Sequence, residues 1–233
     1  MAMKKYNLPS LQGKIIALDG PAGSGKSTTA KLLARTLGYI YLDTGAMYRA
    51  LTYFALKIGV QPSDKTKLTA LAKKVAIEFK HEDDLTRIFI NGEDVTEVIR
   101  TPEITQHVSE VSAHPGVRKA IVARQQEIGK NGSIVAEGRD TTTVVFPSAD
   151  MKVYLDASVK IRAQRRLLDM SKMGITTTLE QQIADIKRRD DYDSKRKHSP
   201  LTRAKDAYYV DTTNMTVEEQ VDWIINLIKQ IIK

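Results

Sequence analysis

The residues of this 233-residue chain whose types and spacing could do chemistry begin with a glycine-rich segment. It reads G-P-A-G-S-G-K-S-T over residues 20–28 and fits the pattern G-x-x-x-x-G-K-[ST] of phosphate-binding loops. Glycines let such a loop wrap around phosphates with its amide hydrogens pointing inward, and the following helix adds its positive N-terminal end. Lys26 would reach the β- and γ-phosphates, and the Ser27 hydroxyl would face a magnesium ion. The segment therefore predicts a site for a nucleoside triphosphate with Mg²⁺.

The residues on either side favour this interpretation over a glycine-rich turn without a ligand. Residues 15–18 are apolar or small, as in a buried strand. Residues 29–37 have helical periodicity that ends at Gly38. Strand, loop and helix thus follow one another in the order that a phosphate-binding loop requires.

Two further charged segments follow predicted strands. The first, D-T-G-A-M-Y-R, spans residues 43–49, and the second, G-R-D, spans residues 138–140. Ligands of parallel sheets bind at the carboxyl ends of strands, so Arg49 and Arg139 could grip a second phosphate group that faces the triphosphate. A structural salt bridge is the alternative for each arginine, and capping of the following helix is the alternative for Asp43.

Composition limits the classes of protein to which the chain can belong. A hydrophobic content of 42% and a charged content of 27% are typical of a globular protein. The absence of cysteine excludes disulfides and a catalytic thiol, and suits the cytoplasm. Residues 1–14 have no apolar core of a signal peptide, and no apolar run is long enough to predict a membrane-spanning helix. We expect a cytoplasmic protein that binds no membrane.

The net charge of +8 is compatible with nucleic acid, an anionic membrane or small phosphorylated substrates as partners. Basic residues are concentrated between Lys187 and Asp206, where Tyr192 is the only aromatic residue. Polynucleotide channels usually add several aromatic platforms, so the pattern favours a local phosphate clamp over a nucleic-acid site. A solvated helix face is the alternative.

The predicted elements alternate between strands and helices, which is typical of a parallel α/β sheet. Five strands are expected at residues 15–18, 39–42, 133–137, 151–155 and 208–210. Helices are expected at residues 29–37, 46–58, 64–75, 102–114, 115–129, 158–173, 179–197 and 216–232. A small antiparallel insert at about residues 76–100 contains Asn91-Gly92, a strong signal for a hairpin turn. The sequence predicts a P-loop NTPase-type fold, with a five-stranded parallel sheet flanked by helices.

Four motifs together resemble the bacterial cytidylate kinase family over about residues 13–232. They are G-P-A-G-S-G-K-S-T (20–28), D-T-G-A-M-Y-R (43–49), G-R-D with T-V-V-F-P (138–147) and R-D-D-Y-D-S-K-R (189–196). The resemblance implies transfer of the γ-phosphoryl group from ATP to CMP or dCMP with Mg²⁺. It also implies a single kinase domain over residues 1–233, with a monophosphate-binding insert at about 64–105 and a helical lid at about 162–200.

The resemblance further implies a role for each matching residue. The ATP phosphates would be held by Gly20, Pro21, Ala22, Gly23, Ser24, Gly25, Lys26, Ser27 and Thr28, with Ser27 toward the metal, and by the lid residues Arg162, Arg165 and Arg166. The CMP phosphate would be gripped by Arg49, Arg139 and Arg196, beside Asp43. The cytosine would be read by Ser109, Arg118 and Asp140, and the ribose hydroxyls would be contacted by Arg189 and Asp193. Lys26, Arg49, Arg139, Arg166 and Arg196 would act on the transferring group.

One residue departs from the family pattern, because Thr142 stands where the family usually has glycine. A β-branched residue would be strained there if the backbone needs a positive φ. Three other functions stay open at this point: a kinase for UMP or AMP, a nucleic-acid-associated ATPase, and a nucleotide-binding regulator without turnover. We expect a monomer that binds small-molecule substrates and no nucleic acid.

Overall fold

The structure is a computed structural model that describes residues 11–82 and 85–231. The chain divides into two compact units. The first comprises Met1–Leu42, Gly132–Lys195 and Pro200–Lys233, and the second comprises Asp43–Asn131 and Arg196–Ser199. The expectation of one kinase domain with an insert and a lid stays a prediction.

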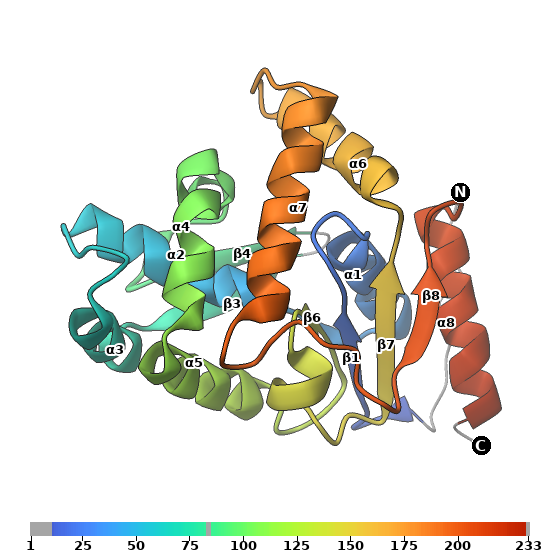
Figure 1. The fold of residues 1–233 in the computed structure, drawn as a ribbon. Coiled ribbons are helices and arrows are strands. Elements are labelled where there is room, and N and C mark those ends of the chain that lie inside the picture. The colour runs from blue at the N-terminus through green and yellow to red at the C-terminus, as the bar shows by residue number, and fades with distance from the viewer. Residues whose placement is uncertain (1–10, 83–84, 232–233) are drawn as a thin grey trace. The chain divides into compact units, whose positions relative to one another are not determined.

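A five-stranded sheet forms the centre of the first unit (Figure 1). Its strands are β1 (Ile15–Asp19), β2 (Ile40–Asp43), β6 (Ile134–Gly138), β7 (Met151–Asp156) and β8 (Tyr208–Asp211). Their order in the sheet is β2-β6-β1-β7-β8, and β1 runs parallel to both of its neighbours. The five predicted strands and the parallel sheet are confirmed.

Strand β1 lies at the middle of this sheet because its residues are apolar on both faces. Ile16 is opposite Val135 of β6 and Met151 of β7, and none of the three is exposed by more than a few per cent. Strands buried on both faces are near-continuous apolar runs, as this one is. Central burial fixes the carboxyl end of β1, where the glycine-rich loop begins.

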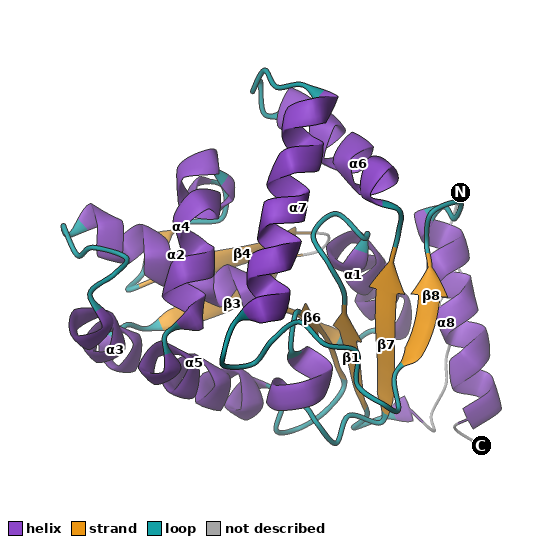
Figure 2. Cartoon of the chain, viewed as in Figure 1, coloured by secondary structure: helices purple, strands orange, loops and turns teal. Residues whose placement is uncertain are grey.

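Four helices accompany the sheet in the first unit (Figure 2). They are α1 (Lys26–Leu37), α6 (Val159–Lys172), α7 (Leu179–Lys195) and α8 (Val217–Ile231). Helix α1 ends at Gly38, whose φ of 69° is in the left-handed region that suits glycine. Helix α8 begins with a capping box, in which Thr216 and Glu219 each accept a hydrogen bond from the other's backbone amide.

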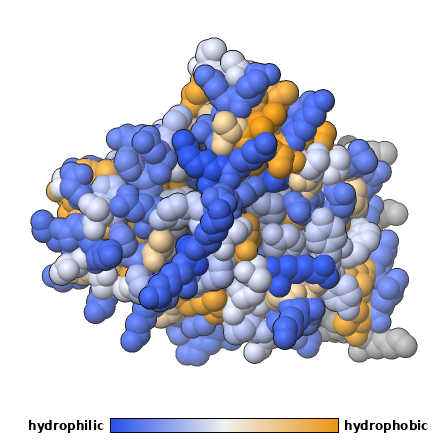
Figure 3. Space-filling view, viewed as in Figure 1, coloured by the Kyte–Doolittle hydropathy of each residue, from blue (hydrophilic) through white to orange (hydrophobic). Residues whose placement is uncertain are grey.

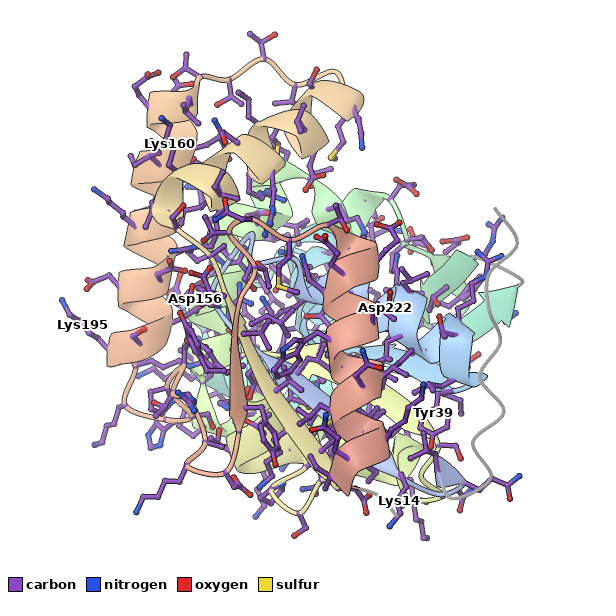
Figure 4. The ribbon with its side chains drawn as sticks, turned by 90° about the vertical axis from the view of Figure 1, so that its right-hand side faces the viewer. Lys14, Tyr39, Asp156, Lys160, Lys195 and Asp222 are labelled. Carbon is purple, nitrogen blue, oxygen red and sulfur yellow. The ribbon has the colours of Figure 1, made fainter. Side chains whose placement is uncertain are left out.

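The core of this unit lies between the sheet and the helices α1 and α8. It includes Leu18 of β1, Leu33 of α1, Val153 of β7 and Ile224 of α8, all fully buried. The apolar stripe of α8 therefore belongs to the core, while Asp222 lies on the exposed side of the same helix (Figure 4).

Helices α6 and α7 form a pair with a much smaller core. That core contains Ala22 of the glycine-rich loop, Ala163 of α6 and Ile186 of α7, all buried. The partly buried Val159, Leu179 and Ile183 pack against it. Figure 3 shows apolar side chains over this helix pair among many hydrophilic ones. The predicted charged helix at residues 179–197 therefore packs through a thin apolar stripe that includes Ile183 and Ile186.

The second unit contains four helices and a separate antiparallel sheet. The helices are α2 (Thr44–Lys57), α3 (Lys65–Lys74), α4 (Pro102–Ala113) and α5 (Pro115–Ile128), and the sheet has the order β3-β4-β5 (Ile77–Glu82, Leu85–Ile90 and Glu93–Asp94). Asn91 and Gly92 have φ of 49° and 83°, so the predicted turn with two positive φ angles joins β4 to β5. The predicted antiparallel insert is confirmed, and Pro102 and Pro115 begin their helices as expected.

Two short elements within the described residues were not predicted. Val98–Arg100 forms a 3₁₀ turn, η2, and Thr141–Val145 forms a π-helical turn, η3. Short turns of this kind lack the long periodicity on which sequence patterns depend. In the described part of the chain, no helix is long and apolar enough to cross a membrane.

We expect Ile224→Ala to destabilise the protein by about 2–5 kcal/mol, because it removes buried methyl groups from the core and leaves a cavity. Asp222→Ala, on the exposed side of the same helix, is the matched control and should change the free energy of unfolding by less than about 0.5 kcal/mol. Urea denaturation of the three proteins checks this. Equal losses in both variants would show that α8 contributes through its helical propensity and not through the core.

Candidate active site

The glycine-rich loop, residues 20–27, is called the P-loop from here on. Its first two carbonyl groups each accept a hydrogen bond from a cationic side chain. Arg139 Nη1 donates to the Gly20 oxygen at 3.0 Å, and Lys26 Nζ donates to the Pro21 oxygen at 2.8 Å. The first arginine predicted to grip a phosphate is therefore already in contact with the predicted triphosphate loop.

Two more P-loop carbonyl groups are held in the same way. Arg162 Nη1 donates to the Ala22 oxygen at 3.0 Å, and the Thr212 hydroxyl donates to the Ser24 oxygen at 2.9 Å. Within one planar trans peptide unit, the carbonyl group and the amide hydrogen point in opposite directions. Side chains that hold the carbonyl groups therefore help to direct the amide hydrogens of this loop toward other acceptors, and the Ala22 amide donates to the carboxylate of Asp190 at 3.2 Å.

Gly20 is required by the close approach of the neighbouring strand. Its φ is 153°, and a Cβ atom placed on it would lie 1.9 Å from the backbone oxygen of Leu155 in β7. Backbone cannot yield as a flexible side chain can, so any larger residue would separate β1 from β7 at the start of the P-loop.

Lys26 is the cation at the centre of the loop. Only 4% of it is exposed, and burial lowers its pKa to about 7, with the charge of Arg139 acting in the same direction. Glu137 and Asp19 oppose the shift. The neutral amine of Lys26 is therefore ready to take up a proton when an anion binds.

Glu137, at the end of β6, is a site residue that the sequence analysis missed. Its Oε1 accepts a hydrogen bond from Ser27 Oγ at 2.7 Å and one from the Tyr41 hydroxyl at 3.2 Å. A carboxylate and a hydroxyl side by side are the hard oxygen donors that Mg²⁺ prefers. The signal in the sequence was the apolar strand I-V-A that ends in this acid.

Arg139, Arg189 and Asp193 are brought together above the P-loop. Arg139 Nε lies 2.9 Å from Asp193 Oδ2, and Arg189 Nε lies 3.9 Å from the same oxygen. Asp193 is almost fully buried on α7. Arg139, predicted to grip the CMP phosphate, and Arg189, predicted to contact the ribose, therefore lie near the same carboxylate oxygen. That oxygen belongs to Asp193, which is itself a predicted ribose contact.

The three predicted lid arginines occupy different environments on α6. Arg162 is 5% exposed and is fixed by Ala157 O at 2.9 Å and by Asp190 Oδ2 at 2.5 Å. Arg165 donates to the oxygens of Thr212, and Arg166 is partly exposed. Arg162 also donates to the P-loop oxygen of Ala22, and the role of all three in the lid stays a prediction. Figure 4 labels Asp156, the last residue of β7, and Lys160, in the first turn of α6.

Asp140 and Thr142 lie in the loop after β6. Asp140 is 4% exposed, and its backbone oxygen accepts the amides of Val144 and Val145 in the π-helical turn. Thr142 is not among the described residues with positive φ, so the strain considered for a β-branched residue does not arise. Its amide and hydroxyl instead contact Asp19.

In the second unit, Arg118 and Arg196 converge on one residue. Arg118 Nε donates to Ser199 Oγ at 2.9 Å, and the Arg196 side chain donates to the Ser199 backbone oxygen. Arg118 also lies over the Tyr48 ring, 5.4 Å from its centroid. Ser109 lies on α4, one turn before Ser112, and its backbone oxygen accepts a hydrogen bond from the Ser112 hydroxyl.

Asp43 and Arg49 lie at the start of α2. Asp43 accepts the Ala46 amide at 2.9 Å, which confirms the capping alternative, and its second oxygen lies 3.6 Å from Arg100. Arg49 Nη1 donates to Thr105 Oγ1 at 2.9 Å. A role for either residue toward substrate stays a prediction.

Comparisons with known proteins agree with this arrangement. The family model described as cytidylate kinase matches residues 16–230. The curated cytidylate kinase of Ligilactobacillus salivarius is 52% identical over 92% of this chain and 96% of its own length. That of Enterococcus faecalis is 50% identical over 94% and 97%, respectively.

A solved structure with the same fold comes from an uncharacterized protein of Eubacterium ventriosum ATCC 27560. It covers 94% of this chain and 99% of its own, with a TM-score of 0.53 and 12% sequence identity. At this identity the likeness concerns the fold alone.

We expect the binding of Mg²⁺-ATP at pH 8 to take up about half to one proton per site, because Lys26 is largely neutral beforehand and the phosphates hold its charged form. Affinity should accordingly fall as the pH rises above about 7. Titration calorimetry in HEPES and in Tris, which differ in ionisation enthalpy, measures the uptake. Lys26→Arg is the control, because a guanidinium stays charged and should remove the uptake. Equal uptake in both proteins would assign the proton to another group.

Proposed function

The chain belongs to the cytidylate kinase family and is a phosphotransferase of nucleoside monophosphates, and on that premise we propose that it transfers the γ-phosphoryl group of ATP to CMP or dCMP. The products are CDP or dCDP and ADP, and the reaction serves pyrimidine nucleotide metabolism in the cytoplasm. The observation that carries the proposal is the contact of Arg139 with the P-loop oxygen of Gly20.

This contact supports transfer between two phosphate groups over simple nucleotide binding. The P-loop binds the phosphates of the donor nucleotide. Arg139 follows the neighbouring strand β6, and its side chain reaches the Gly20 oxygen of the P-loop. Phosphoryl transfer requires donor and acceptor phosphates roughly in line, with cations on the charge of the moving group. A cation between the two loops supplies both the alignment and part of the neutralisation.

Ser27 and Glu137 would hold the magnesium ion, the hydroxyl directly and the carboxylate through the ion's water shell. The 2.7 Å contact between them supports this assignment, because it places two oxygen donors side by side. When bound, Mg²⁺ supplies charge neutralisation of the phosphate oxygens.

The remaining work falls to binding and orientation. The phosphate of CMP is already a nucleophile, so no side chain needs to remove a proton from it. Lys26, with the P-loop amides, binds the donor phosphates, and Arg49, Arg139 and Arg196 orient the acceptor phosphate. Arg165 and Arg166 of α6 complete the cations around the donor phosphates and help to exclude water, the competing acceptor.

Base recognition is proposed for Ser109, Arg118 and Asp140. Cytosine offers a donor at its 4-amino group and acceptors at N3 and O2, whereas uracil presents an acceptor at O4 and a donor at N3. An ionised Asp140 can only accept and Arg118 can only donate, which fits the edge of cytosine. A salt bridge that merely orients Arg139 is the alternative role of Asp140.

An initial-rate assay of ADP release with Mg²⁺-ATP against CMP, dCMP, UMP and AMP tests the function. We expect CMP and dCMP to be the best acceptors, with about 10²- to 10⁴-fold higher kcat/KM than UMP, from two unpaired polar groups at roughly 1–3 kcal/mol each. A preference for UMP or AMP would identify a kinase of another monophosphate. ADP release that needs polynucleotide and no monophosphate would instead identify a nucleic-acid-associated ATPase.

We expect Asp140→Asn to lower kcat/KM for CMP and to narrow the ratio between CMP and UMP, because an amide can donate to O4 of uracil. The same assay with both substrates measures the ratio. Asp191→Asn is the matched control: it removes an exposed carboxylate that is paired with Lys195 at 2.6 Å, and should leave the ratio unchanged. Loss of both activities by the same factor in Asp140→Asn would exclude base reading by this residue.

A further inference from the structure

Asp19 is a fully buried carboxylate that the proposed mechanism does not use. It is the last residue of β1 and directly precedes Gly20 of the P-loop, with no exposed surface. Its Oδ1 accepts the Thr141 amide at 2.8 Å. Its Oδ2 accepts both the amide and the hydroxyl of Thr142, at 2.7 and 2.6 Å. One side chain at the root of the donor loop thus holds the backbone that follows Arg139 and Asp140.

A second hydrogen bond joins the same two loops, and here the side chain belongs to the other loop. Arg139, from the same loop as Thr141 and Thr142, donates to the backbone oxygen of Gly20 at 3.0 Å. Each loop therefore binds the other's backbone with a side chain. We call this pair of contacts the clasp, formed by Asp19, Gly20, Arg139, Thr141 and Thr142.

The chemistry of the clasp requires a carboxylate at position 19. Burial raises the pKa of Asp19, whereas the hydrogen bonds from Thr142 and Thr141 act in the opposite direction. All three partners are donors, and an ionised carboxylate is the side chain that offers only acceptors. An asparagine would keep one acceptor oxygen and would direct an NH₂ group at a donor that already occupies the place.

We infer that Asp19 is a positioning residue that fixes the loop carrying Arg139 and Asp140 against the P-loop, and so sets the acceptor groups at their distance from the donor phosphate. The inference rests on the proposed function. Misplacement of reacting groups by about 1 Å can cost on the order of 10²-fold in rate. A buried carboxylate with two amide partners is a stiffer link between two loops than an exposed ion pair.

Thr142 gives this chain a third contact that glycine or any residue without a hydroxyl would lack. The amide of residue 142 is available from any non-proline residue, but the 2.6 Å contact needs a hydroxyl. Thr142 therefore strengthens the clasp from a buried position, which makes it the better position for mutation.

The clasp predicts a particular pattern of kinetic losses. Loosening it should leave the P-loop able to bind Mg²⁺-ATP but should separate donor from acceptor. We expect kcat for transfer to the monophosphate to fall about 10- to 100-fold in Asp19→Asn and about 3- to 10-fold in Thr142→Val. The affinity for Mg²⁺-ATP should change less than about 3-fold, and the fraction of ATP that is hydrolysed instead of transferred should rise.

Two variants serve as controls in the same turn. Thr142→Ser keeps the hydroxyl and should stay within about 2-fold of the original kcat. Thr143→Val removes the neighbouring hydroxyl, which lies 3.5 Å from the Asp140 backbone oxygen and does not contact Asp19, and should also stay within about 2-fold. The experiment measures ATP binding by calorimetry, and transferred and free phosphate by separation of the products.

Two results would overturn the inference. One is a parallel loss of ATP affinity and of transfer in Thr142→Val, with an unchanged hydrolysed fraction, which would make Asp19 a structural support of the P-loop. The other is equal activity of Thr142→Val and Thr142→Ser. If Asp19→Asn does not fold, the Thr142 pair decides alone. If the panel of monophosphates shows that CMP is not the acceptor, the same ratios are measured with the acceptor found, so failure of the proposed function is recognised separately.

Discussion

The hydrogen bonds that hold the carbonyl groups of the P-loop are the interactions on which the rest of the site depends. Four of these groups are bound by side chains from within the loop and from three other segments of the chain: Lys26, Arg139, Arg162 and Thr212. Without them the loop would have to satisfy its carbonyl groups and its amides through the same turn, as an ordinary glycine-rich segment does. With them, an amide of the loop can turn to an anionic acceptor, as the Ala22 amide does toward Asp190. The buried strand β1 and the contact of Gly20 with Leu155 fix where this loop starts.

The same contacts bring cations close to one another, and carboxylates balance them. Asp193 and Asp190, both on α7, bind Arg139 and Arg162 respectively. Glu137 and Asp19 favour the charged form of Lys26 against its burial. Buried charges are tolerated when they are paired and hydrogen-bonded, which is the condition met here. Phosphates that bind here would therefore meet cations that are already paired with carboxylates. Two of these carboxylates, Asp190 and Asp193, lie on α7.

Much of this could be predicted from the sequence, because the signals are local. The P-loop pattern, the strand before it, the proline at the start of α4 and the Asn91-Gly92 turn each depend on neighbouring residues. The contacts of Glu137 with Ser27, and of Asp19 with Thr142, join residues more than one hundred positions apart. The apolar strands that end in these two acids do not indicate which residues the acids contact. Arg162 was assigned to the lid by resemblance to the family, and that role stays a prediction. Its contacts with the backbone oxygens of Ala157 and Ala22 and with Asp190 are revealed by no sequence pattern.

The central claim is that the donor loop and Arg139 serve one transfer between two phosphates. The most direct test follows the labelled phosphate of [γ-³²P]ATP in a reaction with CMP and Mg²⁺, and identifies the products. The account predicts that the label appears at the β-position of CDP, in an amount equal to the ADP formed. Label found only in inorganic phosphate, with CMP unchanged, would contradict it.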